Sequence, residues 1–389
     1  MSSRSRSRQP SLLVTVIILI AGAAIYLFQS TQPQTAVPTP AAPTLPSDTS
    51  ASPQGMPSWL KVYFTDPNPP DNLGSGIDRF VKTDLDAAQQ TIDVTSFDLN
   101  IPDLVNALAD AEKRGVKVRV VYDGTNGSLD VNNAASGSQP FEAIKVLTSA
   151  KVGLVNGGRS SGLMHDKMVI IDSKILYMGS WNLSYNDSYR NNNNLLRITD
   201  SRLIANYQAK FNELFVDKRF GTHAQVQAPN PSLTIDGVAV ENYFAPEDGV
   251  MARLVALVQG AKKSVHYMIF TYTHQDLSDA MIARSKAGLD VEGVIENRGA
   301  SQGALVPLFC AKLPVKVDGN KYTMHHKVII LDGNTVVTGS FNFTQSADKE
   351  NDDNLIVIHS AAVAAAYEQQ FQKIYGQGQA PDGSGFKCK

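Results

Sequence analysis

The chain has very few cysteines. Only Cys310 and Cys388 occur among its 389 residues, and they are not in a CxxC spacing. That scarcity excludes a disulfide framework and makes a cysteine-ligated zinc site improbable. Two interpretations of the pair stay open: two unrelated thiols, or one disulfide that pins the C-terminal tail.

The sequence also lacks a strong charge of either sign. Its formal net charge is -2, and residues 59–389 hold 32 basic against 36 acidic residues. A dedicated nucleic-acid binder usually has a basic surplus, so the composition disfavours that class without excluding a local basic groove. The 43% hydrophobic and 19% charged residues are typical of a globular protein.

The N-terminus is basic and then apolar. Residues 1–10 carry three arginines, and residues 11–28 include an uncharged run from Leu12 to Phe28. A run of about 17 to 20 apolar residues is long enough to cross a bilayer, so we expect a transmembrane anchor rather than a cleaved signal. The arginines predict a cytoplasmic N-terminus and an extracytoplasmic globular part, periplasmic or extracellular; cleavage of residues 1–28 would make the protein secreted. Residues 29–58, rich in Pro, Thr and Ser, predict a disordered linker.

The remaining sequence contains an internal duplication. HDKMVIID at 165–172 recurs as HHKVIILD at 325–332, and GSWN at 179–182 recurs as GSFN at 339–342. The common offset of 160 residues indicates two copies of one structural unit. Earlier segments match at an offset of 173, so the first copy has about 13 extra residues, which we place in 124–138.

Alternating strand and helix patterns predict an α/β fold. We expect two tandem halves at 59–220 and 239–378, each a mixed or mostly parallel sheet flanked by helices. A connection at 221–238 and a tail at 379–389 complete the expected organisation.

The duplicated polar residues suit phosphodiester chemistry. In a strand, residues two apart share a face, so His165 projects with Lys167 and His325 with Lys327. Lysine neutralises phosphate oxygens, and imidazole acts as a nucleophile or proton donor. The GSxN side chains add possible hydrogen-bond donors to the phosphate: Ser180, Asn182, Ser340 and Asn342.

HxK(x)4D followed by GSxN resembles the signature of the phospholipase D superfamily, and it appears complete twice. The resemblance implies that one histidine forms a phosphohistidine while the other protonates the leaving alcohol and then activates water. It implies no metal and no cofactor. It also implies one active site on a pseudo-two-fold axis between the halves, so that a monomer suffices.

The resemblance implies a carboxylate that supports a histidine ring near Asp353, where the first half has Asn193. Because a carboxylate stabilises imidazolium, we expect His325 to be the general acid and His165 the nucleophile. The motif aspartates, Asp172 and Asp332, fall at odd spacing from the lysines and are expected to brace loops. Histidines 223, 266, 274, 326 and 359 are interpreted as structural.

The predicted membrane anchor and the acidic balance favour hydrolysis of phospholipid headgroup esters. The second motif is also similar to those of small secreted bacterial nucleases in the superfamily, which keeps an endonuclease as the alternative. Phosphatidyl transfer and a catalytically silent binding scaffold are further alternatives. A scaffold is disfavoured because no histidine or lysine of either motif is missing.

Overall fold

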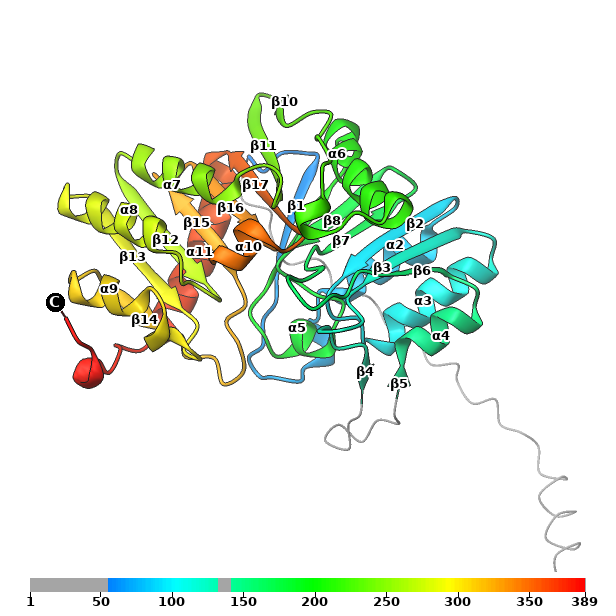
Figure 1. The fold of residues 1–389 in the computed structure, drawn as a ribbon, viewed down its shortest axis with the longest axis horizontal. Coiled ribbons are helices and arrows are strands. Elements are labelled where there is room, and N and C mark those ends of the chain that lie inside the picture. Colours follow the sequence, from blue (N-terminus) through cyan, green and yellow to red (C-terminus); the bar gives the residue numbers. More distant parts are fainter. Residues whose placement is uncertain (1–54, 132–140, 389) are drawn as a thin grey trace, which may run out of the picture. The chain divides into compact units, whose positions relative to one another are not determined.

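The computed structural model describes residues 55–131 and 141–388, which form two β-sheets with helices on both sides of each (Figure 1). The first sheet has the strand order β1-β9-β8-β7-β2-β3-β6, and the second has β10-β11-β17-β16-β15-β12-β13-β14. Apart from β10, each strand of one sheet has a counterpart in the other. The predicted α/β class with two tandem halves is confirmed.

The first sheet contains β1 (Leu60–Phe64), β2 (Thr91–Ser96), β3 (Lys117–Tyr122), β6 (Gly153–Asn156), β7 (Met168–Ile171), β8 (Ile175–Gly179) and β9 (Asn194–Ile198). The second contains β10 (Ser232–Ile235), β11 (Val238–Ala245), β12 (Ser264–Ile269), β13 (Asp290–Ile295), β14 (Val315–Val317), β15 (Lys327–Leu331), β16 (Thr335–Gly339) and β17 (Asp353–His359). The helices of the first half are α2 (Asp78–Ala87), α3 (Pro102–Lys113), α4 (Ala143–Ser149), α5 (Tyr185–Tyr189) and α6 (Ser201–Asn212). Those of the second are α7 (Val250–Gly260), α8 (Gln275–Lys286), α9 (Leu305–Cys310), α10 (Gln345–Lys349) and α11 (Ala361–Gln377).

Both sheets are mixed. Among the described strands, only β2–β3, β3–β6 and their counterparts β12–β13 and β13–β14 pair in parallel, joined by the crossover helices α3, α4, α8 and α9. The strands of the HxK and GSxN motifs instead form antiparallel hairpins, β7–β8 and β15–β16. Tight turns at Asp172 and Asp332, both with positive φ, force that arrangement. A mixed sheet is therefore confirmed, and a mostly parallel one is wrong.

Three apolar cores hold these layers together. One lies between the first sheet and α2, α3 and α4, and another between the second sheet and α7, α8 and α9. The third joins the two halves: α6 and α11 pack between the sheets with the apolar faces of β7, β8, β15 and β16. Tyr207 and Phe211 of α6 and their counterparts Tyr367 and Phe371 of α11 are fully buried there. This shared core fixes the two HxK strands relative to one another.

The extra residues of the first half fall between β3 and α4, as expected. The described part of this insertion includes the short paired strands β4 (Asp130–Val131) and β5 (Phe141–Glu142). The segment that we predicted as a connection contains β10, which pairs with β11 as an extra edge strand of the second sheet.

The two cysteines form a disulfide. Cys310, at the end of α9, is bonded to Cys388 in the tail. The rings of Phe309 and Phe386 meet edge to face beside it, with centroids 5.2 Å apart. Of the two interpretations that the sequence leaves open, the structure has the tail fastened to the second half.

No helix within 55–131 and 141–388 is long and apolar enough to cross a bilayer. The longest of them, α11, has 17 residues and places polar side chains such as Glu368 and Lys373 among its apolar ones. This finding contradicts the predicted membrane localisation, which we correct. The run at 11–28 on which that prediction depended lies outside the described residues, as do residues 1–10 and most of the expected linker.

Candidate active site

The two HxK motifs lie where the halves meet. The main-chain N–H of His165 donates to the carbonyl of Asp352 in the other half, and the N–H of His325 donates to the carbonyl of Asn192, both at 2.9 Å. Short parallel bridges accompany these contacts, pairing residue 164 with 352 and residue 324 with 192. Exchanging the halves maps one contact onto the other, as a pseudo-two-fold axis requires.

Each histidine ring is held by a side chain of the opposite half. Nδ1 of His165 lies 2.7 Å from Oδ1 of Asp353, and Nδ1 of His325 lies 2.9 Å from Oδ1 of Asn193. The sequence led us to place Asp353 beside His325, within the same half. That pairing is wrong because the packing of the halves crosses the supporting residues over.

The lysines lie in matching positions. Nζ of Lys167 donates to the carbonyl of His165, and Nζ of Lys327 to that of His325, both at 2.8 Å. A phenylalanine at the end of the neighbouring strand packs on each pair: the ring centroid of Phe97 lies 5.3 Å from that of His165, and Phe270 lies 4.7 Å from His325. Aromatic walls of this kind limit the water around the polar groups.

Burial sets the electrostatics of the site. It lowers the pKa of His165, with Lys167 lowering it further against the opposing carboxylate of Asp353. Burial also lowers the pKa of His325 well below its ordinary value, and Lys327, Lys167 and His165 add to that effect. The pKa of both lysines is lowered by burial as well. Charges of one half thus act on groups of the other, which indicates that the four residues lie close together, in surroundings that favour an anion.

The GSxN serines support the histidine partners. Ser180 donates to Oδ1 of Asn193 at 2.8 Å, and Ser340 donates to Oδ1 of Asp353 at 2.6 Å. Each hydroxyl also accepts a main-chain N–H, from Asn194 or its counterpart. Their predicted phosphate contact is therefore corrected: the hydroxyls are engaged in orienting the groups that hold the imidazoles.

The two GSxN asparagines differ in their surroundings. The side-chain amide of Asn182 donates to Asp187 at 2.7 Å. In the second half Ala347 replaces that aspartate, and Oδ1 of Asn342 is buried with no hydrogen-bond partner. The amide of Asn182 is thus held by a carboxylate, whereas Asn342 lacks the corresponding partner.

The motif aspartates lie away from the histidines and brace turns. The carboxylate of Asp172 accepts the main-chain N–H groups of residues 89, 90 and 91 at 2.7–2.9 Å. The carboxylate of Asp332 does the same for residues 262, 263 and 264. Burial acts to raise the pKa of each, but these N–H donors outweigh it and lower the pKa. Both residues join the HxK hairpin to the start of the adjacent strand.

Two carboxylates near the site were not predicted from the sequence. Oδ2 of Asp187 lies 3.6 Å from Nδ1 of His325. Asp98, next to Phe97, has its pKa raised to about 6 by burial and by Asp187. The second half has Ala347 at the position of Asp187 and Thr271 at the position of Asp98. An acidic residue that is present in only one of the two copies is therefore the sequence feature that could have identified both.

The family described as "Cardiolipin synthase, PLD-like domain" matches residues 81–215 and 254–375. These segments make up well over half of the chain, and each contains one HxK and one GSxN motif. The chain therefore belongs to the phospholipase D superfamily, within the family of the cardiolipin synthase PLD-like domain.

Two relatives indicate the class of enzyme. A mitochondrial cardiolipin hydrolase of Xenopus tropicalis is 30% identical over 130 residues, which are 33% of this chain and 62% of that protein. A phospholipase D of Rickettsia prowazekii (strain Madrid E) is 32% identical over 134 residues, which are 34% of this chain and 65% of that protein. The chain thus spans less than two thirds of the length of either relative. Their names support a phospholipase D-like phosphodiesterase.

A solved structure supports the fold of the whole chain. The phosphatidylserine synthase of Haemophilus influenzae Rd KW20 is similar with a TM-score of 0.63, at 13% identity, over 83% of this chain and 87% of that one. The likeness shows the fold alone, and it covers both halves.

Proposed function

We propose that this protein is a phosphodiesterase that works through a phosphohistidine without a metal, and that it hydrolyses phospholipid headgroup esters. The observation that carries the proposal is that each of the two histidine rings is hydrogen-bonded by a side chain of the opposite half. Each ring is fixed at Nδ1 by the opposite half, so each presents Nε2 to the substrate. Lys167 and Lys327 supply positive charge for the non-bridging phosphate oxygens.

In the first step, Nε2 of His165 attacks phosphorus and the bond to the leaving oxygen breaks. The imidazolium of His325 gives its Nε2 proton to that oxygen, which departs as an alcohol. In the second step, His325, now neutral, takes a proton from water as the resulting hydroxide attacks phosphorus. The phosphorus–nitrogen bond breaks, which restores both histidines.

The crossed pairing gives these roles a different basis from the one expected. Asp353 accepts the Nδ1 proton of His165 and stabilises the positive charge that develops on this ring when Nε2 bonds to phosphorus. Its own pKa is raised by burial but lowered more by His165 and Lys167, so it is ionised at neutral pH. Burial and the two lysines lower the pKa of His325, and the carboxylate of Asp187, 3.6 Å from its Nδ1, opposes that effect. The negative charge of the bound phosphodiester acts in the same direction as Asp187, so we place the protonation of His325, which a general acid needs, in the enzyme–substrate complex.

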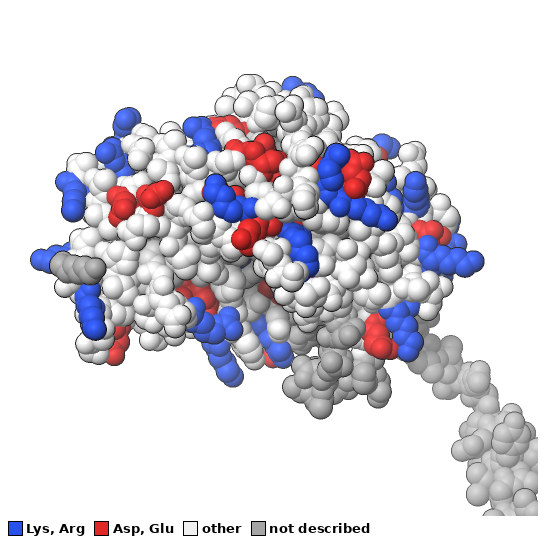
Figure 2. Space-filling model, viewed as in Figure 1, with Lys and Arg blue, Asp and Glu red and all other residues white. Residues whose placement is uncertain are grey.

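A phospholipid is the favoured substrate. The named relatives include a cardiolipin hydrolase and a phospholipase D. On the face seen in Figure 2, lysines and arginines are scattered among acidic residues rather than gathered into a basic stripe. An extended nucleic acid is bound mainly through such basic surface, so an endonuclease remains the second candidate.

Hydrolysis of bis(p-nitrophenyl) phosphate in EDTA tests the proposed chemistry. The wild-type protein is expected to turn over, and His165→Ala or His325→Ala to lose at least about 10²-fold in rate. His223→Ala, an exposed histidine outside the site, is the matched control and should stay active. No turnover in any of the four proteins would make the chain a binding scaffold rather than an enzyme, and equal turnover in all four would place the chemistry outside the two histidines.

The substrate is tested by comparing vesicles of phosphatidylcholine and cardiolipin with single-stranded DNA, all in EDTA. Phosphatidic acid or phosphatidylglycerol products that require both histidines support the proposal. Cleavage of DNA with intact lipid would establish the endonuclease instead. Added ethanol distinguishes hydrolysis from transfer, since a transferase would release phosphatidylethanol.

A further inference from the structure

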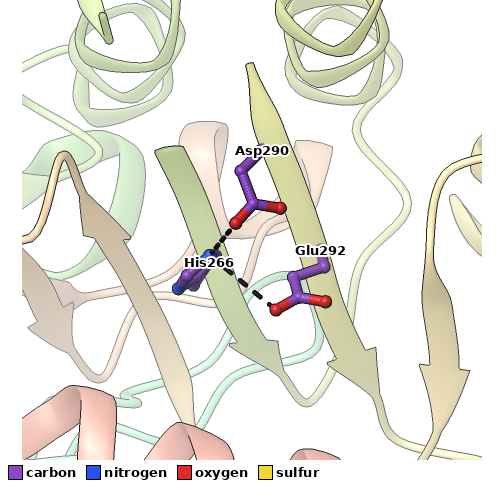
Figure 3. Close-up of side chains that lie close together, drawn as sticks. All are labelled: His266, Asp290 and Glu292. Atoms are coloured by element: carbon purple, nitrogen blue, oxygen red, sulfur yellow. Dashed lines mark hydrogen bonds and ion pairs between the residues drawn. The ribbon is translucent and has the colours of Figure 1, made fainter. Parts of the chain in front are cut away.

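A histidine and two carboxylates lie together on the second sheet, apart from the active site. His266 on β12 and Asp290 and Glu292 on β13 each offer a ligand atom, and these atoms lie within 4.8 Å of one another (Figure 3). Nε2 of His266 is 3.3 Å from Asp290 and 3.8 Å from Glu292. The side chains share a face because β12 and β13 run parallel with His266 opposite Glu292.

The imidazole is oriented from its other nitrogen. Nδ1 of His266 lies 2.9 and 3.0 Å from the two carboxylate oxygens of Glu368 on α11, and the ring stacks on Phe371 with centroids 4.9 Å apart. Nδ1–H donates to Glu368, and Nε2–H points at Asp290 and donates a hydrogen bond to it; a cation bound at Nε2 would displace that proton. A histidine that binds a metal usually donates its other ring N–H to a carboxylate, a main-chain carbonyl or a water, and Glu368 fills that role here.

The duplicated half provides an internal comparison. At the positions equivalent to 266, 292 and 368 it has Asp93, Arg119 and Gln208, and Lys117 stands at the position of Asp290. There the positive charge is in excess, because two cations, Arg119 and Lys117, stand against the one carboxylate of Asp93. Arg119 makes two hydrogen bonds of 2.6 Å to Asp93, and Gln208 adds one of 2.8 Å.

The second half carries an excess of negative charge at the corresponding positions. Three carboxylates surround one imidazole, and no lysine or arginine in the described chain forms an ion pair with any of the three. An imidazolium would neutralise only one of the three charges. The cluster therefore has the charge and the ligand types for a cation.

We infer that His266, Asp290 and Glu292 bind a divalent transition-metal ion of the Zn²⁺ class, with Glu368 positioning the histidine. Ligand bonds of 2.0–2.1 Å in a tetrahedral site place ligand atoms about 3.4 Å apart. The distance from Nε2 to Asp290 already matches, and Asp290 is 63% exposed and free to adjust. A water molecule completes the coordination.

The inferred site is independent of the proposed catalysis. His266 lies near the beginning of β12, whereas Phe270, which packs on His325, follows the end of that strand. A metal held here ties β12, β13 and, through Glu368, α11 together. It should therefore change stability and leave turnover in EDTA unaffected.

Equilibrium dialysis of the untagged full-length protein against Zn²⁺ tests the inference. We expect one ion per chain in the wild type, and its loss in His266→Gln and Asp290→Asn. Glu368→Gln should weaken binding about 10- to 100-fold because the histidine loses its charged partner. His359→Gln is the matched control: His359 also contacts a carboxylate, Glu241 at 2.9 Å, but only one.

The melting temperature gives a second readout. Zn²⁺ should raise it in the wild type and in His359→Gln, but not in His266→Gln, because an ion bound only to the folded state stabilises that state. Equal zinc binding in the wild type and in His266→Gln would overturn the inference. So would an absence of bound zinc in the wild type, which would leave the cluster as a plain imidazolium–carboxylate ion pair.

Discussion

The carboxylate of Asp353 on β17 accepts a hydrogen bond across the interface from Nδ1 of His165, at 2.7 Å. The same oxygen accepts the hydroxyl of Ser340 at 2.6 Å. The second half thereby fixes the tautomer of the histidine that the first half supplies. In the reverse direction Asn193 does this for His325, but with an uncharged side chain.

Replacing Asp353 by asparagine should slow the chemical step. Asp353→Asn keeps the size of the side chain but removes the charge that stabilises the phosphohistidine, so kcat should fall about 10²-fold or more with little change in KM. Asp93→Asn, which removes another buried and paired carboxylate, should leave kcat unchanged. Steady-state kinetics on a soluble phosphodiester provide the measurement, and an unchanged kcat in Asp353→Asn would contradict the assignment.

Asp187 should set the pH range of the general acid. Its carboxylate lies 3.6 Å from Nδ1 of His325, opposing the effects of Lys327, Lys167 and His165 on this ring. In Asp187→Asn the pKa of His325 should fall, so the protonated acid is lost at lower pH. The alkaline limb of kcat/KM should then move down by about one pH unit or more. An alkaline limb that stays in place would rule out this role.

Gly339 is required by the close approach of two strands. Its φ is +152°, and a Cβ there would lie 2.2 Å from the carbonyl oxygen of Asn354. Gly339→Ala should therefore destabilise the protein by about 2 kcal/mol or more. Gly376→Ala, in α11 with nothing within 4 Å, should instead stabilise by up to about 1 kcal/mol. Urea unfolding of both variants provides the measurement, and equal effects would contradict the geometry.

His326 should make the fold sensitive to acid. Burial lowers its pKa from 6.5 to about 3, so the unfolded chain binds more protons between these values. The stability that its neutral form contributes is complete above pH 6.5 and is lost as the pH falls toward 3. In His326→Gln this loss disappears, so the wild type should lose up to about 1.4 kcal/mol per pH unit more than the variant between pH 6 and pH 4. Urea unfolding at a series of pH values provides the measurement. If the free energies of unfolding of the two proteins fell in parallel as the pH is lowered, this role of His326 would be refuted.

The doubled motif suffices to predict the α/β class and the four residues His165, Lys167, His325 and Lys327 as one group. Strand alternation puts each pair on one face, and the duplication indicates that the pairs act together. The edge strand β1, its counterpart β11 and the helix α2 carry no motif, so the sequence does not predict them.

The partners of the histidines do not follow from the sequence. Asp353 is 188 residues from His165 but only 28 from His325, so proximity in sequence points to the wrong histidine. The true pairing depends on how α6 and α11 pack between the sheets. Asp187 is missed for a related reason, since the short helix α5 brings it to His325 of the other half.

The most direct test of the account is to trap the covalent intermediate. His325→Asn should still allow attack by His165 on a substrate with a good leaving group, such as bis(p-nitrophenyl) phosphate, but should slow hydrolysis of the intermediate. Peptide mass spectrometry after a quench at high pH should then find the phosphoryl adduct on His165. An adduct on His325 of the converse variant His165→Asn, with none on His165 in His325→Asn, would contradict the proposed roles.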